Sequence, residues 1–243
     1  MSTVAIVQAR MGSTRLAGKV LMALGSATVL ARVVCRLRRA SLIDEIVVAT
    51  TSSVMDDAIV EECRSLAVEC LRGSEHDVLD RYYISAKACA ADAVVRITSD
   101  CPIIDPELVN ETIRAFQEQA GDYASNTLDP TYPRGLDAEV FTVEALGRAW
   151  REARQPHERE HVTPYFYEHP ELFRLVSVKG DGDYSLCRWT LDTAEDLDLL
   201  RAIYERFDNR DDFTWREVLR LMQIEPQLTQ LNAHIVQKEL RAN

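Results

Sequence analysis

Residues 4–19 read VAIVQARMGSTRLAGK and decide the fold. The first six residues form an apolar run that ends at a turn-rich loop, which is typical of a buried strand. Similar runs predict strands at 45–50, 68–71 and 92–98, and helical spacing predicts helices at 27–40, 55–67, 76–91 and 106–119. Alternating strands and helices predict an α/β protein whose mostly parallel sheet is covered by helices on both faces.

This alternation breaks at about residue 122. Two later segments, 136–142 and 172–179, alternate like half-exposed strands, with helical stretches between them at 143–154 and 158–168. Residues 187–191 are predicted to return to the core sheet, and a helix follows at 194–207. Because no long linker divides the chain, we expect one domain over 1–243. It would consist of an α/β half at 1–121, an inserted α+β subdomain at 122–185, and a return strand with C-terminal helices at 186–243.

The composition is that of an ordinary globular protein, with 47% hydrophobic and 28% charged residues among 243. No apolar run reaches the roughly 18 residues that span a bilayer, and the N-terminus lacks the pattern of a signal peptide. We therefore expect a cytoplasmic protein without a membrane partner. The six cysteines lack any CxxC spacing and are predicted to be reduced core thiols, although Cys101 could also be a catalytic thiol.

The net charge of −11 argues against a duplex nucleic acid as a partner, because such sites are strongly basic. The charges are nevertheless segregated: residues 1–43 contain seven basic residues and no acidic one. This arrangement favours a small polyanion as ligand. Four of these basic residues are predicted to lie on the solvated face of the helix at 27–40, namely Arg32, Arg36, Arg38 and Arg39.

The loop after the first strand holds the other three cations, Arg10, Arg15 and Lys19, with no neutralising acid. Its glycines permit backbone conformations that expose consecutive N–H groups, and such groups beside basic side chains suit a polyphosphate. The spacing is not that of a Walker A loop, and no GxGxxG dinucleotide motif occurs. The alternative is an ordinary turn with basic residues on its surface.

Two carboxylates are candidates for a metal site. Asp100 follows the strand at 92–98, where a side chain would lie beside the first loop, and magnesium prefers one or two carboxylates together with phosphate oxygens. Asp105 is better explained as a helix cap. Asp192 also stands between a predicted strand and a helix, but it could instead be the N-cap, with Glu195 completing a capping box. Spacing alone leaves both roles of Asp192 open.

Six blocks of the chain resemble, in order, those of the spore coat polysaccharide biosynthesis protein F family: VQARMGSTRLAGKVL, RGSEHDVLDRYY, RITSDCPIIDP, YPRGLDAEVFT, REHVTPYFYEHPELF and RWTLDTAEDLDLL. That family is similar to the cytidylyltransferases that make CMP-sialic acid and CMP-3-deoxy-manno-octulosonate. The resemblance covers about residues 3–206. It implies a nucleotidyltransferase fold of the glycosyltransferase-A type, CTP as the donor and Mg²⁺ as the cofactor.

The resemblance also implies roles for individual residues. The triphosphate-binding and catalytic positions would be Arg10, Gly12, Ser13, Arg15 and Lys19, next to Ala9, and the metal ligands would be Asp100 and Asp192. Ala17 stands where the family usually has proline, which removes no ligand. Contacts to the cytosine base are expected from Arg72, Gly73 and Ser74. For the acceptor the resemblance fades. Contacts are expected instead from position in the chain, by Tyr132, Arg134, Asp137, Glu139, Arg159 and His161.

Two further motifs invite other interpretations. Residues 157–161 form a literal HExxH, the zinc-protease pattern, but prolines at 156 and 164 leave only a short, highly charged helix. Residues 181–183 have the DxD form of sugar-nucleotide glycosyltransferases, but the surrounding glycines favour a turn.

Together these features predict a magnesium-dependent cytidylyltransferase, which we expect to be a homodimer. It would transfer CMP from CTP to an acidic sugar or a small phospho or phosphono acceptor in the synthesis of surface polysaccharide or a related glycoconjugate. Two alternatives are a glycosyltransferase of the same fold that consumes a nucleotide sugar, and a nucleotide-binding module without turnover.

Overall fold

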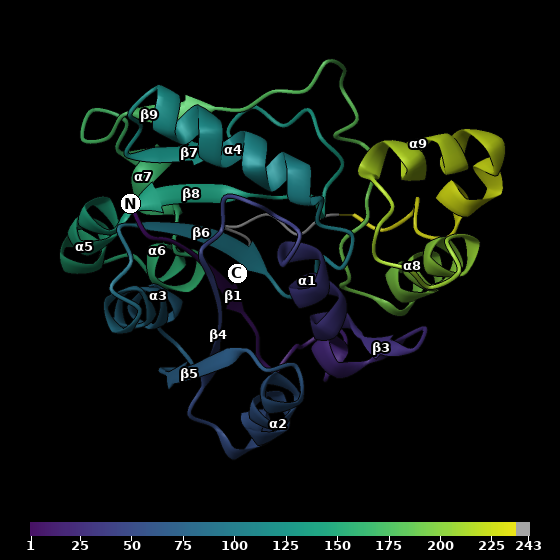
Figure 1. The fold of residues 1–243 in the computed structure, drawn as a ribbon, viewed down its shortest axis with the longest axis horizontal. Helices are drawn as coiled ribbons and strands as arrows, with labels where there is room; N and C mark the ends of the chain where they lie inside the picture. Colours follow the sequence, from purple (N-terminus) through teal and green to yellow (C-terminus); the bar gives the residue numbers. More distant parts are fainter. Residues whose placement is uncertain (237–243) are drawn as a thin grey trace.

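The computed structural model describes residues 1–236, which build one seven-stranded sheet flanked by helices (Figure 1). Across the sheet, the strands run in the order β5 (Glu69–Gly73), β4 (Glu45–Thr51), β1 (Thr3–Gln8), β6 (Ala93–Thr98), β8 (Glu139–Thr142), β7 (Tyr123–Ser125) and β9 (Leu175–Ser177). The first four strands are parallel, β8 is antiparallel to β6 and β7, and β9 is parallel to β7. The predicted mostly parallel sheet is confirmed. No helix among the described residues is long and apolar enough to cross a membrane.

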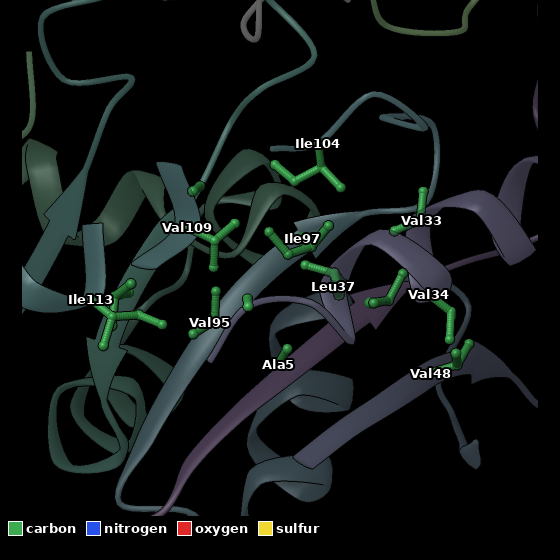
Figure 2. Close-up of a cluster of buried hydrophobic side chains, with 14 of the residues drawn as sticks. Ala5, Val33, Val34, Leu37, Val48, Val95, Ile97, Ile104, Val109 and Ile113 are labelled. Atoms are coloured by element: carbon green, nitrogen blue, oxygen red, sulfur yellow. The ribbon is translucent and has the colours of Figure 1, made fainter. Parts of the chain in front are cut away.

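Helices cover both faces of the sheet, as its buried strands require. On one face lie α1 (Val29–Leu37), α2 (Asp57–Ser65) and α4 (Pro106–Glu118), whose apolar side chains pack against β1, β4 and β6. Figure 2 shows Ile113 of α4 on one side of Val95 and Ile97 of β6, and Leu37 of α1 on the other. On the other face lie α3 (Val78–Ala88), α5 (Val143–Glu152), α6 (Pro156–His161) and α7 (Pro164–Glu168).

A third apolar cluster lies beside the sheet, where α8 (Ala194–Arg206) and α9 (Trp215–Ile224) stand apart from the other helices (Figure 1). The short elements that complete the described chain are η1 (Lys19–Leu21), β2 (Ala23–Leu24), β3 (Ala27–Thr28), η2 (Val54–Asp56) and η3 (Pro226–Gln230). Trp189 and Tyr204 are almost fully buried in this third cluster.

Three predictions about the second half of the chain need correction. Residues 187–191 form no strand of the sheet and contribute only an isolated bridge between Arg134 and Arg188, because their apolar side chains are buried against α8 instead. The helix predicted at 158–168 is divided into α6 and α7 where Val162 has φ 72°. The short strand β7 was missed because a turn-rich sequence follows it directly.

The arginines of α1 also depart from prediction. Arg38 and Arg39 are exposed as expected, but Arg32 and Arg36 are buried, with 3% and 0% of their surface accessible. The loop before α9 covers that side of α1, and both guanidinium groups bind backbone oxygens there. Periodicity could not reveal this, because the covering segment is about 175 residues away in sequence.

Candidate active site

The basic loop after β1 is anchored at both ends. The backbone N–H of Met11 donates to Oδ1 of Asp56 at 2.7 Å, and the other oxygen of this buried carboxylate accepts from Thr50 and Thr51. At the far end, Gly18 has φ +69°, a conformation that favours glycine and precedes η1. The loop therefore returns to the sheet edge with Lys19 directed inward. Sequence reasoning missed Asp56, which looks like any acidic residue at a helix start.

Lys19 brings the two predicted metal carboxylates together. Its Nζ lies 2.7 Å from Oδ2 of Asp100 and 2.9 Å from Oδ1 of Asp192, and it also donates to the carbonyl oxygen of Leu191 at 2.7 Å. Arg15 reaches the same Asp192 oxygen at 2.8 Å. Four residues that the sequence placed in one site thus meet, although they come from three distant segments of the chain.

Asp192 is not the cap of the helix that follows it. The N-cap of α8 is Thr193, whose side chain accepts from the backbone of Asp196, and Asp196 completes the capping box instead of Glu195. Asp192 instead faces cations on both sides, because Arg188 binds its second oxygen at 2.9 Å. The capping interpretation of Asp192 is therefore wrong.

These contacts set the charges of the cluster. Burial alone would raise the pKa of Asp192, but Lys19, Arg188 and Arg15 outweigh it and lower that pKa to about 2. Burial likewise works against the charged form of Lys19, yet Asp100 and Asp192 raise its pKa above the ordinary value. The lysine and Asp192 therefore remain ionised at neutral pH, as a strongly coupled ion cluster.

A cavity of about 280 Å³ opens beside this cluster; we call it the basic cavity. Arg10, Ser13, Arg15 and Lys19 line it together with Asp100 and Asp192. Two of its other lining groups are buried without a hydrogen-bond partner among the described residues, namely Nε of Arg81 and Oε1 of Gln8. Unpaired buried polar groups favour a polar ligand, because their desolvation is otherwise uncompensated.

Arg81 is a site residue that sequence reasoning missed. It stands on α3 and is 3% exposed, and it donates to the carbonyl oxygen of Ser74 at 2.8 Å. Burial lowers the pKa of Arg81, and the nearby Arg10 lowers it further. The sequence hints at the position of Arg81 only through Gly73, where a Cβ would lie 2.8 Å from the Arg81 side chain.

A second cavity, of about 910 Å³, adjoins the first; we call it the large cavity. Thr98 and His161 line both cavities, so the two meet at these side chains. Of the residues predicted to contact the acceptor, five line the large cavity: Tyr132, Arg134, Asp137, Glu139 and His161. The sixth, Arg159, does not, because its guanidinium holds Asp77 and the backbone of Trp150.

The floor of the large cavity holds a buried ion pair. Arg96 on β6 stands opposite Glu139 on β8 and donates to its carboxylate, while the hydroxyl of Tyr123 donates to the other Glu139 oxygen at 2.6 Å. Where the two cavities meet, burial lowers the pKa of His161, so this imidazole is neutral at pH 7.

The residues predicted to contact the base lie at the end of β5. Arg72 binds Asp57 and the backbone oxygens of Thr51 and Ser53, and it does not line the basic cavity. The hydroxyl of Ser74 accepts from the backbone of Asp77. Gly12, predicted to bind the triphosphate, lies nearby beside Glu75. Base contacts by this segment therefore remain a prediction.

The structure gives structural roles to the remaining motifs. His157 pairs with Glu168 at 3.1 Å, and Glu158 accepts the capping bonds of α6, whereas His161 lines the cavities. The two histidines of the HExxH motif therefore do not share one site.

Asp181 is exposed and pairs with Arg216, as expected of a surface turn. Cys101 is buried, and burial raises the pKa of its thiol well above the usual value, which leaves it unreactive.

Comparison with known proteins agrees with this geometry. The cytidylyltransferase family matches residues 4–236. The chain is 35% identical to the spore coat polysaccharide biosynthesis protein SpsF of Bacillus subtilis, with 91% of this chain and 94% of that protein aligned. It is 30% identical to a 3-deoxy-manno-octulosonate cytidylyltransferase of Anaeromyxobacter dehalogenans, over 84% and 86% of the two chains.

The solved structures show the same relationship. A cytidylyltransferase from Leptospira borgpetersenii superimposes with a TM-score of 0.91 at 32% identity, covering 98% of this chain and all of the other. The nucleotidyltransferase fold expected from the resemblance is thereby confirmed, and so is the enzyme class. With its fold, its loop of cations and its paired carboxylates, the chain belongs to the cytidylyltransferase family.

Proposed function

We propose that this cytidylyltransferase transfers CMP from CTP, with Mg²⁺, to an acidic sugar or a small acceptor that bears a phosphate or phosphonate, and releases pyrophosphate. The observation that carries the proposal is the convergence of Lys19, Asp100 and Asp192 beside two joined cavities. The smaller, basic cavity suits a triphosphate, and the larger cavity leaves room for an acceptor.

The residues fit a magnesium ion. Three oxygen atoms, from Asp100, Asp192 and the Leu191 carbonyl, surround one ammonium group at hydrogen-bonding distance. Oxygen ligands of this kind are those that magnesium takes in nucleotide sites, and the ammonium of Lys19 stands in for the cation. Asp100 and Asp192 would hold the ion, which when bound neutralises charge on the phosphate oxygens.

The basic side chains would act on the triphosphate. The ammonium of Lys19 would contact phosphate oxygens, together with Arg10, Arg15 and Arg81 from the same cavity. Positive groups placed where negative charge develops on the departing pyrophosphate stabilise the transition state. The protein would otherwise act by positioning the acceptor for in-line attack on the α-phosphorus.

The acceptor would occupy the large cavity. Arg134 lines it, and within residues 1–236 no side chain pairs with its guanidinium, so it offers a cation to an acidic group. Tyr132 packs edge-on against Trp215 at the wall of this cavity. A role in surface polysaccharide synthesis is supported by the name of the Bacillus subtilis relative. Cytoplasmic location and a homodimer remain predictions.

Pyrophosphate release tests this function. The protein, CTP and Mg²⁺ are incubated with sugar acids, phosphates and phosphonates, and pyrophosphate is measured against ATP, GTP and UTP. We expect release with CTP and one acceptor class. Lys19→Met should lower the rate about a hundredfold or more, because it removes charge stabilisation at the phosphates. Lys179→Met is the matched control, since that exposed lysine pairs with Asp129 on the surface and lines neither cavity.

Full activity of folded Lys19→Met would contradict the assignment of this loop. Release of a nucleoside diphosphate from a nucleotide sugar, without pyrophosphate from CTP, would favour the glycosyltransferase alternative.

A further inference from the structure

The segment that leads into β8 places the Asp137 carboxylate in the wall of the large cavity. Along β6 and β8, Arg96 pairs with Glu139 and Ala93 with Thr142 in an antiparallel register. Extending that register by two residues puts Asp137 opposite Thr98, on the same face as the Arg96–Glu139 pair. Thr98 is one of the two residues that line both cavities, and Asp137 lines the large one.

Asp137 differs from its neighbour Glu139 in how its oxygens are used. Both Glu139 oxygens are occupied, one by Arg96 and one by the Tyr123 hydroxyl. Asp137 accepts only from the backbone N–H of Gly135, at 3.4 Å, through Oδ1. Within residues 1–236, Oδ2 of Asp137 has no hydrogen-bond partner and is not sealed from solvent, and Asp137 lines the large cavity, to which this oxygen is therefore open.

We propose that Asp137 is the general base of the transfer reaction and takes the proton of an acceptor hydroxyl as that oxygen attacks CTP. The new bond joins the hydroxyl oxygen to the α-phosphorus, the bond from that phosphorus to the β-phosphate oxygen breaks, and pyrophosphate leaves. The proton ends on Oδ2 of Asp137 and passes from there to solvent. This inference rests on the function proposed above.

The surroundings of Asp137 suit a base that works near neutral pH. Burial is the main cause that raises the pKa of Asp137 to about 6; Glu139 and Asp100 raise it further, and Arg134 opposes them. The other charged or titratable groups that line this cavity are Arg96 on β6, the neutral His161 on α6, and the phenols of Tyr132 and Tyr167. A base is most effective when its pKa lies close to the working pH, because it is then both ionised and able to hold a proton.

A general base has a consequence for the acceptor. The oxygen of a phosphate or phosphonate is already ionised at neutral pH and needs no base to attack. An alcohol or sugar hydroxyl does. The acceptor therefore attacks through a hydroxyl, and an acidic group that it carries serves for recognition, with Arg134 as the available cation.

Kinetics with Asp137→Asn test the proposal. The hydroxyl acceptors used are 3-deoxy-manno-octulosonate and N-acetylneuraminate, and the oxyanion acceptors are glycerol 1-phosphate and 2-aminoethylphosphonate. We expect pyrophosphate release with a hydroxyl acceptor, at a rate that rises with pH through about 6. Asp137→Asn should lower that rate about a hundredfold or more and abolish this rise, while the thermal shift caused by CTP is retained. Asp129→Asn, the same change at an exposed position outside the cavity, should match the unmodified protein.

An unchanged rate or pH profile in Asp137→Asn would overturn the proposal, and so would release with the oxyanion acceptors alone. If none of the four acceptors reacts, carbon NMR of protein labelled at aspartate carboxyls decides, with Asp137→Asn assigning the signal. Titration near pH 6 supports the proposal, and full ionisation by pH 4.5 overturns it. The proposed function fails separately, when CTP neither binds nor yields pyrophosphate.

Discussion

Asp192 shows at the scale of one residue how the same pattern fits two roles until the contacts are known. It precedes a helix and could cap it, yet Thr193 caps α8 and leaves Asp192 facing Lys19, Arg15 and Arg188. These contacts keep Asp192 ionised and outside the cap of α8, and its role as a metal ligand stays a prediction.

Asp192→Asn separates the two roles. We expect α8 to persist, because its capping box does not involve Asp192, and Mn²⁺ to bind at least about tenfold more weakly in the presence of CTP, because one ligand loses its charge. Paramagnetic resonance of Mn²⁺ measures the affinity, and circular dichroism measures the helix. Asp198→Asn is the matched control, an exposed carboxylate of the same helix. Equal Mn²⁺ affinity in both variants would return Asp192 to a structural role.

Residue types in the basic loop could be interpreted from the sequence because their environment is unusual: three cations without an acid after a buried strand. Arg81 and Asp56 could not. In the sequence, each looks like an ordinary polar residue of a helix. Its role depends on contacts with other segments of the chain, such as that of Asp56 with Met11. Burial decided these roles, and burial is a tertiary property.

At the scale of elements, Arg36 connects three parts of the structure. Its guanidinium donates to the carbonyl oxygens of Ile104, Asp211 and Phe213, so α1 is joined both to the loop after Asp100 and to the segment before α9. Its side chain also lies over the ring of Phe213, at 4.4 Å from the ring centre. Each of the three guanidinium nitrogens of this buried cation donates to a carbonyl oxygen. The helical pattern of α1 does not reveal this structural link.

Arg36→Met tests this link. The apolar side chain has a similar length but leaves the buried carbonyl oxygens of Ile104 and Phe213 without their donor, whereas that of Asp211 keeps its bond from Arg39. We therefore expect the free energy of unfolding to fall by about 3 kcal/mol or more. Urea denaturation measures the change. Arg38→Met, at an exposed position next to the same helix, should cost less than about 1 kcal/mol. Equal losses in the two variants would show that the buried contacts of Arg36 contribute little.

The strands β1, β4 and β6 were predictable because both of their faces are buried, which leaves a continuous apolar run in the sequence. The segment 187–191 has a similar run, but its apolar side chains serve the third cluster instead of the sheet. An apolar run indicates burial and does not say which partner buries it. Pairing between β7, β8 and β9 likewise depends on long-range contacts.

At the scale of the whole molecule, an acidic chain presents a cavity lined by cations. The net charge is −11, yet Arg10, Arg15, Lys19 and Arg81 all border the basic cavity. Three of the seven cations in the first 43 residues thus lie with Arg81 at one edge of the sheet, whereas the other four belong to α1 and the turn after it. Such a distribution favours a small polyanion as ligand.

Thermal unfolding with each of the four nucleoside triphosphates and Mg²⁺ tests directly whether the basic cavity is a CTP site. If the cavity is a CTP site, CTP at a hundred times its dissociation constant stabilises the fold by about 2.7 kcal/mol. For a chain of this size, that raises the melting temperature by about 5–10 °C. We expect ATP, GTP and UTP at the same concentration to raise it distinctly less. Equal shifts from all four nucleotides, or none from CTP, would contradict the account.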